Sequence, residues 1–152
     1  MNSNGVWFYG LSGSGKTFVS KLIKKRIKNS ILVDGDTVRK YISTDLDYSI
    51  KSRNIQIKRI FGISKIIIMS KFYPIISSVW MNEDILKKCK TENILVLKII
   101  RDMEDVFHSH RTYVNNKINI VGKDLKYKNI KTKVIKNNKK EDLLVNIDRI
   151  LL

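Results

Sequence analysis

The stretch at residues 10–17 constrains the fold of this chain more than any other part of its sequence. It fits the pattern G-x-x-x-x-G-K-[ST] with the residues Gly10, Leu11, Ser12, Gly13, Ser14, Gly15, Lys16 and Thr17. Glycines let the backbone turn tightly, so that several N–H groups converge on one anion, and a following helix adds the positive end of its dipole. In such a loop the lysine reaches the β- and γ-phosphates and the hydroxyl binds Mg²⁺. The motif predicts a site for the phosphates of a nucleotide.

The flanking residues support this interpretation. Residues 6–9 form a short apolar run, as expected for a buried parallel strand. After the loop, apolar side chains fall on one helical face and lysines fall largely on the other. The alternative, an ordinary Gly/Ser-rich turn, would not require this order of strand, loop and helix. We refer to residues 10–17 as the phosphate loop.

The remaining apolar runs predict a single α/β domain over residues 1–152. Further strands are expected at 30–33, 66–69, 94–99 and 133–135, and helices at 37–41, 53–64, 79–90, 101–113 and 141–152. The segment 70–78, which holds the only proline, is expected to be a loop. Alternating strands and helices predict a nucleoside-triphosphate-hydrolase (P-loop) fold with about five parallel strands and helices on both faces. Ligands should bind at the carboxyl edge of that sheet.

Charge and composition narrow the partners. The formal net charge is +16, but the basic residues are spread along the chain. This spread favours a solvated basic surface that steers a polyanionic small substrate, rather than an interface for nucleic acid. With one cysteine, no apolar leader and no run of membrane-spanning length, we expect a cytoplasmic protein without a membrane partner. The oligomeric state is left open, with a homodimer as one expectation.

Carboxylates and guanidiniums follow the predicted second strand. Asp34 and Asp36 surround a glycine there, and either carboxylate could accept the proton of an attacking hydroxyl or hold Mg²⁺. The alternative is that Asp-Gly only forms a turn. Arg39 and Arg53 could each bind a phosphate or sulfate, or could form surface ion pairs.

Two other features argue against competing site classes. His108 and His110 have H-x-H spacing and no complementary ligand set, so we interpret them as solvated residues rather than zinc ligands. The predicted third strand ends without an aspartate, which disfavours motor-type ATPases and favours small-molecule kinases.

Taken together, these pieces resemble the adenylylsulfate kinases, which transfer the γ-phosphoryl group of ATP to the ribose 3′-hydroxyl of adenosine 5′-phosphosulfate. The phosphate loop is followed by the matching stretches Asp34-Gly35-Asp36-Thr37-Val38-Arg39, Asp45-Leu46-Asp47-Tyr48-Ser49 with Arg53, Arg59-Ile60 and Arg101-Asp102. Weaker matches are Lys117 and residues 121–124. The resemblance covers residues 5–125.

The resemblance implies a role for each matching residue. The phosphate loop and Arg101 would bind ATP, with Lys16 and Asp36 as catalytic residues and Thr17 and Asp36 as ligands of Mg²⁺. A lid over residues 103–130 would be mobile and would close over the phosphates. The residues implied to bind the acceptor nucleotide are Asp34, Arg39, Tyr48, Arg53, Gln56 and Lys117.

Departures from the family pattern bear on the acceptor. The family's Ser-Pro-Tyr-Arg after the third strand corresponds here to Tyr73-Pro74-Ile75-Ile76, an asparagine is replaced by Gln56, and a lid Lys-Gly-Leu-Tyr is replaced by residues 104–107. An intact phosphate loop with altered acceptor loops favours a variant acceptor, such as the cytidine diphosphoramidate used by capsule-synthesis kinases of this family. A true adenylylsulfate kinase is the alternative.

Two further alternatives remain. One is another P-loop small-molecule kinase, for instance one that resembles shikimate kinases; the absence of a Gly-Gly-Gly run after the third strand counts against it. The other is a basic nucleic-acid-binding module, which would bind DNA or RNA with steep salt dependence.

Overall fold

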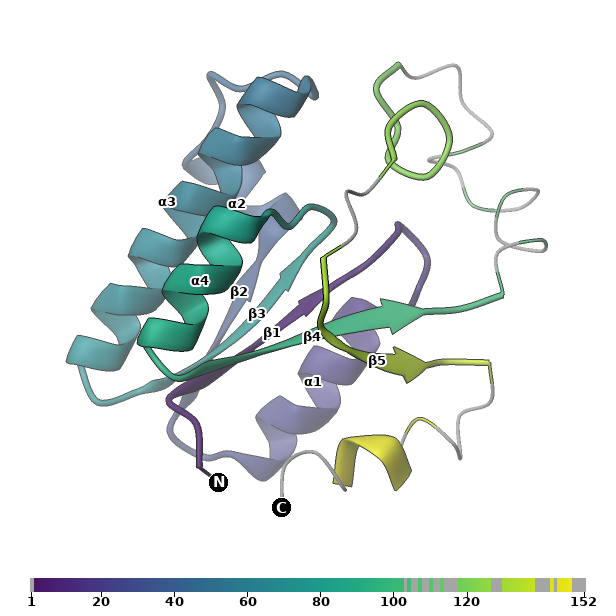
Figure 1. Cartoon of the computed structure of the whole chain (residues 1–152). Coiled ribbons are helices and arrows are strands. Elements are labelled where there is room, and N and C mark those ends of the chain that lie inside the picture. Colours follow the sequence, from purple (N-terminus) through teal and green to yellow (C-terminus); the bar gives the residue numbers. More distant parts are fainter. Residues whose placement is uncertain are drawn as a thin grey trace.

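A computed structural model describes residues 2–102, 104, 107, 110, 113, 118–126, 130–138, 143 and 145–148 of this chain. Its centre is a parallel sheet of five strands in the order β2-β3-β1-β4-β5 (Figure 1). The strands are β1 (Gly5–Tyr9), β2 (Ser30–Asp34), β3 (Tyr73–Ser78), β4 (Ile94–Ile100) and β5 (Lys133–Lys136). The helices are α1 (Lys16–Arg26), α2 (Gly35–Tyr41), α3 (Ile50–Met69) and α4 (Glu83–Thr91). The predicted α/β fold is confirmed.

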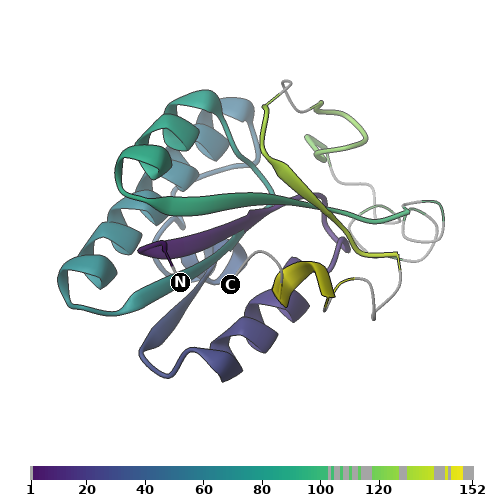
Figure 2. The same cartoon turned by 60° about the horizontal axis from the view of Figure 1, so that its bottom comes forward.

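Helices cover both faces of the sheet (Figures 1 and 2). On one face, Trp7 of β1 is buried in a core that includes Ile57 and Ile60 of α3 and Ile85 of α4. On the other face, Phe8 is buried in a core with residues of α1 and with Leu143 and Ile147. All five residues of β1 are buried, because this central strand is covered on both sides. The phosphate loop therefore follows a fully buried central strand.

The predicted third strand was wrong. Residues 66–69 belong to the 20-residue helix α3, and β3 lies at Tyr73–Ser78, inside the segment predicted to be a loop. A run of four apolar residues does not by itself distinguish a strand from a buried helix. Pro74 is tolerated because it stands near the start of β3, where the register pairs it with Ile31 of β2.

Three predicted helix starts also shift. Helix α3 begins at Ile50 rather than at residue 53, and the other two starts shift for local reasons. Helix α4 begins at Glu83 rather than at residue 79, because the Asn82 side chain accepts a hydrogen bond from the Ile85 N–H and caps the helix. Helix α2 begins at Gly35, directly after β2, because the Asp34 carboxylate caps it.

The other two predicted helices lie partly outside the described residues. Described residues 104, 107 and 113 are helical within the predicted 101–113 segment, as are 143 and 145–148 within the predicted closing helix. Within the described ranges, no helix has both the length and the apolarity needed to cross a bilayer.

Candidate active site

A cleft of about 910 Å³ opens at the carboxyl ends of β1, β2 and β3. Its walls come from the phosphate loop, the start of α2, the 47–60 region, the end of β3 and residues 118–121. This is the sheet edge at which the alternating pattern places ligands in folds of this type. The predicted site residues that line it are Ser12, Gly13, Lys16, Thr17, Asp34, Asp36, Arg39, Tyr48, Arg53 and Gln56.

The phosphate loop has backbone conformations that require glycine. Gly10, Gly13 and Gly15 have φ values of 157°, 81° and 97°. A Cβ atom on Gly10 would stand 2.2 Å from the Ile99 carbonyl oxygen of the neighbouring strand. Because that obstacle is backbone, the loop can approach β4 this closely only without a side chain.

Lys16 is held inside the loop. Its side chain is 9% exposed, and its ammonium donates a hydrogen bond of 2.7 Å to the Leu11 carbonyl oxygen. Burial lowers the Lys16 pKa to about 8, and the nearby Asp36 and Asp34 carboxylates oppose that shift. A desolvated amine beside two carboxylates would gain strongly from the negative charge of a phosphate.

Asp34 and Asp36 differ in their surroundings. One oxygen of Asp34 accepts hydrogen bonds from the Asp36 and Thr37 N–H groups at 3.0 and 3.2 Å, and the other accepts one from the Ser77 hydroxyl at 2.7 Å. Asp34 thus caps α2 and ties β2 to β3. The Asp36 side chain is exposed in the cleft, near enough to Lys16 to affect its charge. Of the two carboxylates, Asp36 has the geometry expected of a reacting group.

Thr17 and Asp36 form a donor set that fits Mg²⁺. Both are exposed and both line the cleft. Within the described part of the chain, no three His, Cys, Asp or Glu side chains group together as a protein-only metal site. Mg²⁺ is commonly held by one or two protein groups together with substrate phosphates, so a hydroxyl and a carboxylate beside a phosphate loop are sufficient.

Elsewhere in the cleft lining, two guanidiniums face the Tyr48 ring. The central carbon of Arg39 lies 4.6 Å from the ring centroid, and that of Arg53 lies 5.6 Å from it. Arg53 is 8% exposed and donates hydrogen bonds to the carbonyl oxygens of Tyr48 and Asn119 at 3.1 and 2.8 Å. Three of the six side chains predicted to bind an acceptor are therefore brought together.

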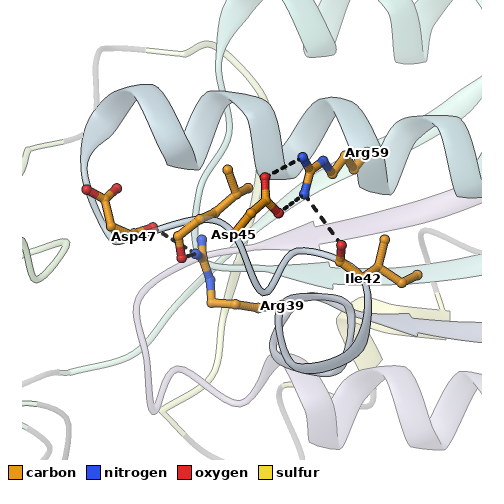
Figure 3. Close-up of polar contacts among 6 residues, drawn as sticks. Arg39, Ile42, Asp45, Asp47 and Arg59 are labelled. Carbon is orange, nitrogen blue, oxygen red and sulfur yellow. Dashed lines mark hydrogen bonds and ion pairs between the residues drawn. The ribbon is translucent and has the colours of Figure 1, made fainter.

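Ion pairs and hydrogen bonds hold the loop that carries Tyr48 (Figure 3). Arg39 donates to the carbonyl oxygens of Leu46 and Asp47 at 3.2 and 2.8 Å. The Arg59 guanidinium of α3 donates two hydrogen bonds of 2.5 and 2.8 Å to the Asp45 carboxylate, and this contact lowers the Asp45 pKa. Hydrogen bonds from Ser49 and Ser52 lower the Asp47 pKa to about 2. We call residues 42–49 the acceptor loop.

Gln56 lies at the base of the cleft. Its amide nitrogen donates a hydrogen bond of 2.9 Å to the Gly35 carbonyl oxygen. Its buried amide oxygen has no hydrogen-bond partner among the described residues. Because Gly35 leads into Asp36, this contact joins α3 to the segment that carries the exposed carboxylate.

The position of β3 corrects one of the departures. Residues 73–76 lie inside the strand, so the segment after it begins with Val79, and serines stand at the strand end as Ser77 and Ser78. The placement of residues 73–76 after the third strand was therefore wrong. An arginine is still missing from residues 77–84, and β3 still ends without an aspartate.

Five of the predicted site residues that the structure describes do not line the cleft: Gly10, Leu11, Ser14 and Gly15 of the phosphate loop, and Arg101. Arg101 follows β4 directly, is exposed and is not among the residues that line the cleft. Lys117 lies outside the described residues, as do His108 and part of the predicted lid.

Sequence reasoning missed several residues that line the cleft and two that contact the phosphate loop. His110 lines the cleft, although it was interpreted as a solvated residue. Ile120 and Val121 are 4% and 2% exposed, in a segment expected to contain few core residues. The Tyr113 hydroxyl donates to Ser12 and the Asn137 amide donates to Ser14, both on carbonyl oxygens of the phosphate loop. Apart from the apolar pair at 120–121, no local pattern marked these positions, because their partners are distant in sequence.

Comparison with known proteins points to one family. Residues 2–93 match the sequence model of the family described as adenylylsulphate kinase. Curated relatives include the adenylyl-sulfate kinase of Buchnera aphidicola from Schizaphis graminum, 37% identical over 76 residues, and that of Staphylococcus haemolyticus, 40% identical over 67 residues. These matches cover 47% and 41% of this chain, but only 36% and 34% of the relatives' length.

Solved structures share the fold. The APS kinase of Mycobacterium tuberculosis, in complex with AMPPNP and APS, superposes with a TM-score of 0.80 at 18% identity, over 99% of this chain and 96% of that one. The thymidylate kinase of Ehrlichia chaffeensis gives a TM-score of 0.50 at 15% identity over the whole of both chains.

Proposed function

Because this chain belongs to the adenylylsulphate kinase family, we propose that it is an ATP-dependent kinase that phosphorylates a ribose 3′-hydroxyl of a small nucleotide. One observation carries the proposal. The phosphate loop, the exposed Asp36 and the Arg39–Tyr48–Arg53 group line a single cleft of about 910 Å³. That volume is in the range of sites for small ligands, and the cleft combines an anion site with an aromatic, cationic site.

The proposed chemistry is an in-line transfer. Backbone N–H groups of the loop and the Lys16 ammonium would take up the charge that develops on the phosphoryl oxygens. Asp36 would orient the attacking hydroxyl and accept its proton as the new O–P bond forms and ADP leaves. Thr17 and Asp36 would hold Mg²⁺, whose contribution is to neutralise charge on the phosphates.

For the acceptor, the cleft wall favours a flat, anionic molecule. Tyr48 offers a half-exposed ring for base stacking, and Arg39 and Arg53 add positive charge beside it. A variant acceptor such as cytidine diphosphoramidate is our first candidate, because Gln56 and the segment after β3 depart from the family pattern. Adenosine 5′-phosphosulfate is the second, and the serines at the end of β3 favour it. The cytoplasmic location and the homodimer stay predictions.

The test is ATP consumption with Mg²⁺, with each acceptor offered separately and the product identified by mass. We expect turnover with one nucleotide and none with the other. Binding of ATP without turnover of either would contradict the acceptor class and leave the phosphate site intact. Tight, steeply salt-dependent binding of DNA or RNA without kinase activity would favour the nucleic-acid module instead.

Asp36 is tested separately. In Asp36→Asn we expect kcat to fall about 100-fold or more, because general-base catalysis is lost, while ATP binding stays near that of the wild type. Asp84→Asn is the matched control, since Asp84 is an exposed carboxylate on α4 that pairs with Lys88 of the same helix. Full kcat in Asp36→Asn would remove Asp36 from the proposed role.

A further inference from the structure

Two described side chains from the last third of the chain donate hydrogen bonds to carbonyl groups of the phosphate loop. Asn137 follows β5, and its Nδ2 atom donates a hydrogen bond of 2.7 Å to the Ser14 carbonyl oxygen. Tyr113 is 6% exposed, and its hydroxyl donates a hydrogen bond of 3.1 Å to the Ser12 carbonyl oxygen. Neither residue lies in residues 2–93, the stretch that matches the family model.

A carbonyl oxygen of this loop that pointed into the phosphate site would weaken anion binding by electrostatic repulsion. A trans peptide is planar, so its C=O and the N–H of the next residue point in opposite directions. If the Ser14 carbonyl rotated toward the cleft, its oxygen would repel phosphate and the Gly15 N–H would turn away. Glycine at position 15, with φ 97°, leaves this peptide more rotational freedom than another residue would.

We propose that Asn137 is a positioning residue for triphosphate binding, which fixes the Ser14–Gly15 peptide so that its N–H points to the phosphate site. Tyr113 does the same for the Ser12–Gly13 peptide. The inference rests on the proposed function in that ATP is the ligand, but it concerns the loop and not the acceptor.

The surroundings of Asn137 fit a fixed donor. Its backbone N–H donates a hydrogen bond of 2.8 Å to the Ile100 carbonyl oxygen, and this contact anchors the residue to the end of β4. The amide orientation is determined, because the Ser14 carbonyl can only accept a hydrogen bond. A Cβ atom on Gly15 would stand 2.1 Å from Nδ2, so the glycine also makes room for this amide.

Another described side chain, that of Lys16, contacts a loop carbonyl in a different way. The Leu11 carbonyl oxygen accepts from Lys16 Nζ at 2.7 Å. Lys16 belongs to the phosphate machinery itself, so this hydrogen bond can be exchanged for one to a phosphate. Asn137 and Tyr113 can hold their peptides in place while that exchange occurs.

Asn137→Asp is the decisive variant, since it keeps the shape of the side chain and removes the donor. Asn138→Asp is the matched control. It adds the same charge at the next residue, where the Asn138 side-chain oxygen accepts from the Asp102 N–H, a role that a carboxylate retains. Asn137→Ala removes the donor without adding charge.

The measurements are the dissociation constants of Mg·ATP and of inorganic tripolyphosphate, with the melting temperature of the ligand-free protein. For Asn137→Asp and Asn137→Ala we expect both constants to rise about 10-fold, while Asn138→Asp stays near the wild type. The ligand-free melting temperature should fall only slightly in the Asn137 variants, because loss of one hydrogen bond costs little stability, whereas a general packing defect would lower it much more. Equal constants in the Asn137 and Asn138 variants would overturn the inference.

Tyr113→Phe tests the second donor, with Tyr73→Phe as control. Each change removes one hydroxyl that makes a hydrogen bond, but the Tyr73 hydroxyl contacts Ser3, away from the cleft. We expect weaker tripolyphosphate binding only in Tyr113→Phe; unchanged binding would remove Tyr113 from the proposal. Loss of acceptor turnover with normal ATP binding in the wild type would contradict the proposed function and leave this inference standing. Absence of phosphate binding in the wild type would overturn both.

Discussion

The guanidinium of Arg39 lies over the ring of Tyr48, 4.6 Å from the ring centroid. The same guanidinium donates to two carbonyl oxygens of the acceptor loop. Arg39 therefore packs against the Tyr48 ring and also fixes the backbone of the loop to which Tyr48 belongs. The Tyr48 side chain remains 49% exposed, which leaves area for a ligand to stack upon.

Tyr48→Ala should raise the KM of the acceptor about 10-fold, because base stacking on an aromatic ring contributes on the order of 1–3 kcal/mol. Tyr48→Phe should retain most of the affinity, since it keeps the ring. The KM of ATP should not change in either variant. Tyr41→Ala is the control, because Tyr41 also contacts a cation, Lys40, but does not line the cleft. An unchanged acceptor KM in Tyr48→Ala would show that the base binds elsewhere.

Asp45→Asn should loosen the acceptor loop by breaking the two-pronged contact with Arg59. The Asp45 side chain is 58% exposed and that of Arg59 is 33% exposed, so the effect should be small, about 2- to 5-fold on the acceptor KM, and weaker at high salt. Steady-state kinetics at low and high ionic strength would measure it. Asp84→Asn, which breaks an exposed pair on α4, should leave this KM unchanged. A larger change in the KM of ATP than in that of the acceptor would contradict the assignment.

Lys16 should make ATP binding depend on pH in a defined direction. Its pKa of about 8 lies below the usual 10.5, so above pH 8 the ligand-free amine is largely neutral. Bound phosphates raise this pKa, and binding near pH 9 should therefore take up protons and weaken as pH rises. Calorimetry in two buffers of different ionisation enthalpy would detect the uptake. Lys16→Met should abolish it, and Lys21→Met, on the exposed side of α1, should not.

The same shift has a consequence for stability. Between pH 8 and 10.5 the unfolded chain binds more protons at Lys16 than the folded chain does, so the contribution of Lys16 to the free energy of unfolding rises with pH. Below pH 8 the buried charge is a full cost, and Lys16→Met should be more stable than the wild type there. That advantage should shrink toward pH 10.5 in urea titrations; a constant difference would contradict the shifted pKa.

Gly10→Ala should destabilise the protein by about 2 kcal/mol or more, since the new methyl group meets the Ile99 carbonyl and the backbone φ is 157°. Gly62→Ala is the matched control. Gly62 lies within α3, and a methyl group added there would have no neighbouring atom within 4 Å, so alanine should stabilise the helix by about 0.5–1 kcal/mol. Chemical denaturation of both variants would measure the two signs, and a stable Gly10→Ala protein would refute the close contact with β4.

Local pattern was enough for the parts of the site that are continuous in sequence. The phosphate loop, the strand before it and the Asp34–Asp36 pair could be identified because each feature follows from residues within a few positions of one another. Tyr48 and Arg53 were assigned to the acceptor site only through the family resemblance. The meeting of the phosphate loop with the Asp34–Asp36 pair also followed, since carboxyl ends of parallel strands share an edge.

The third strand and the contacts that stabilise the phosphate loop depended on long-range packing. Residues 66–69 are apolar enough for either a strand or a helix, and the choice depended on whether they packed as part of α3. Asn137 and Tyr113 lie 123 and 101 positions from the loop residues they contact, beyond the reach of any local pattern. Which residues can bind phosphate could be read from the chain itself, because that chemistry lies in one short motif. Which distant donors orient that motif depends on how the chain packs, and only the fold brings them together.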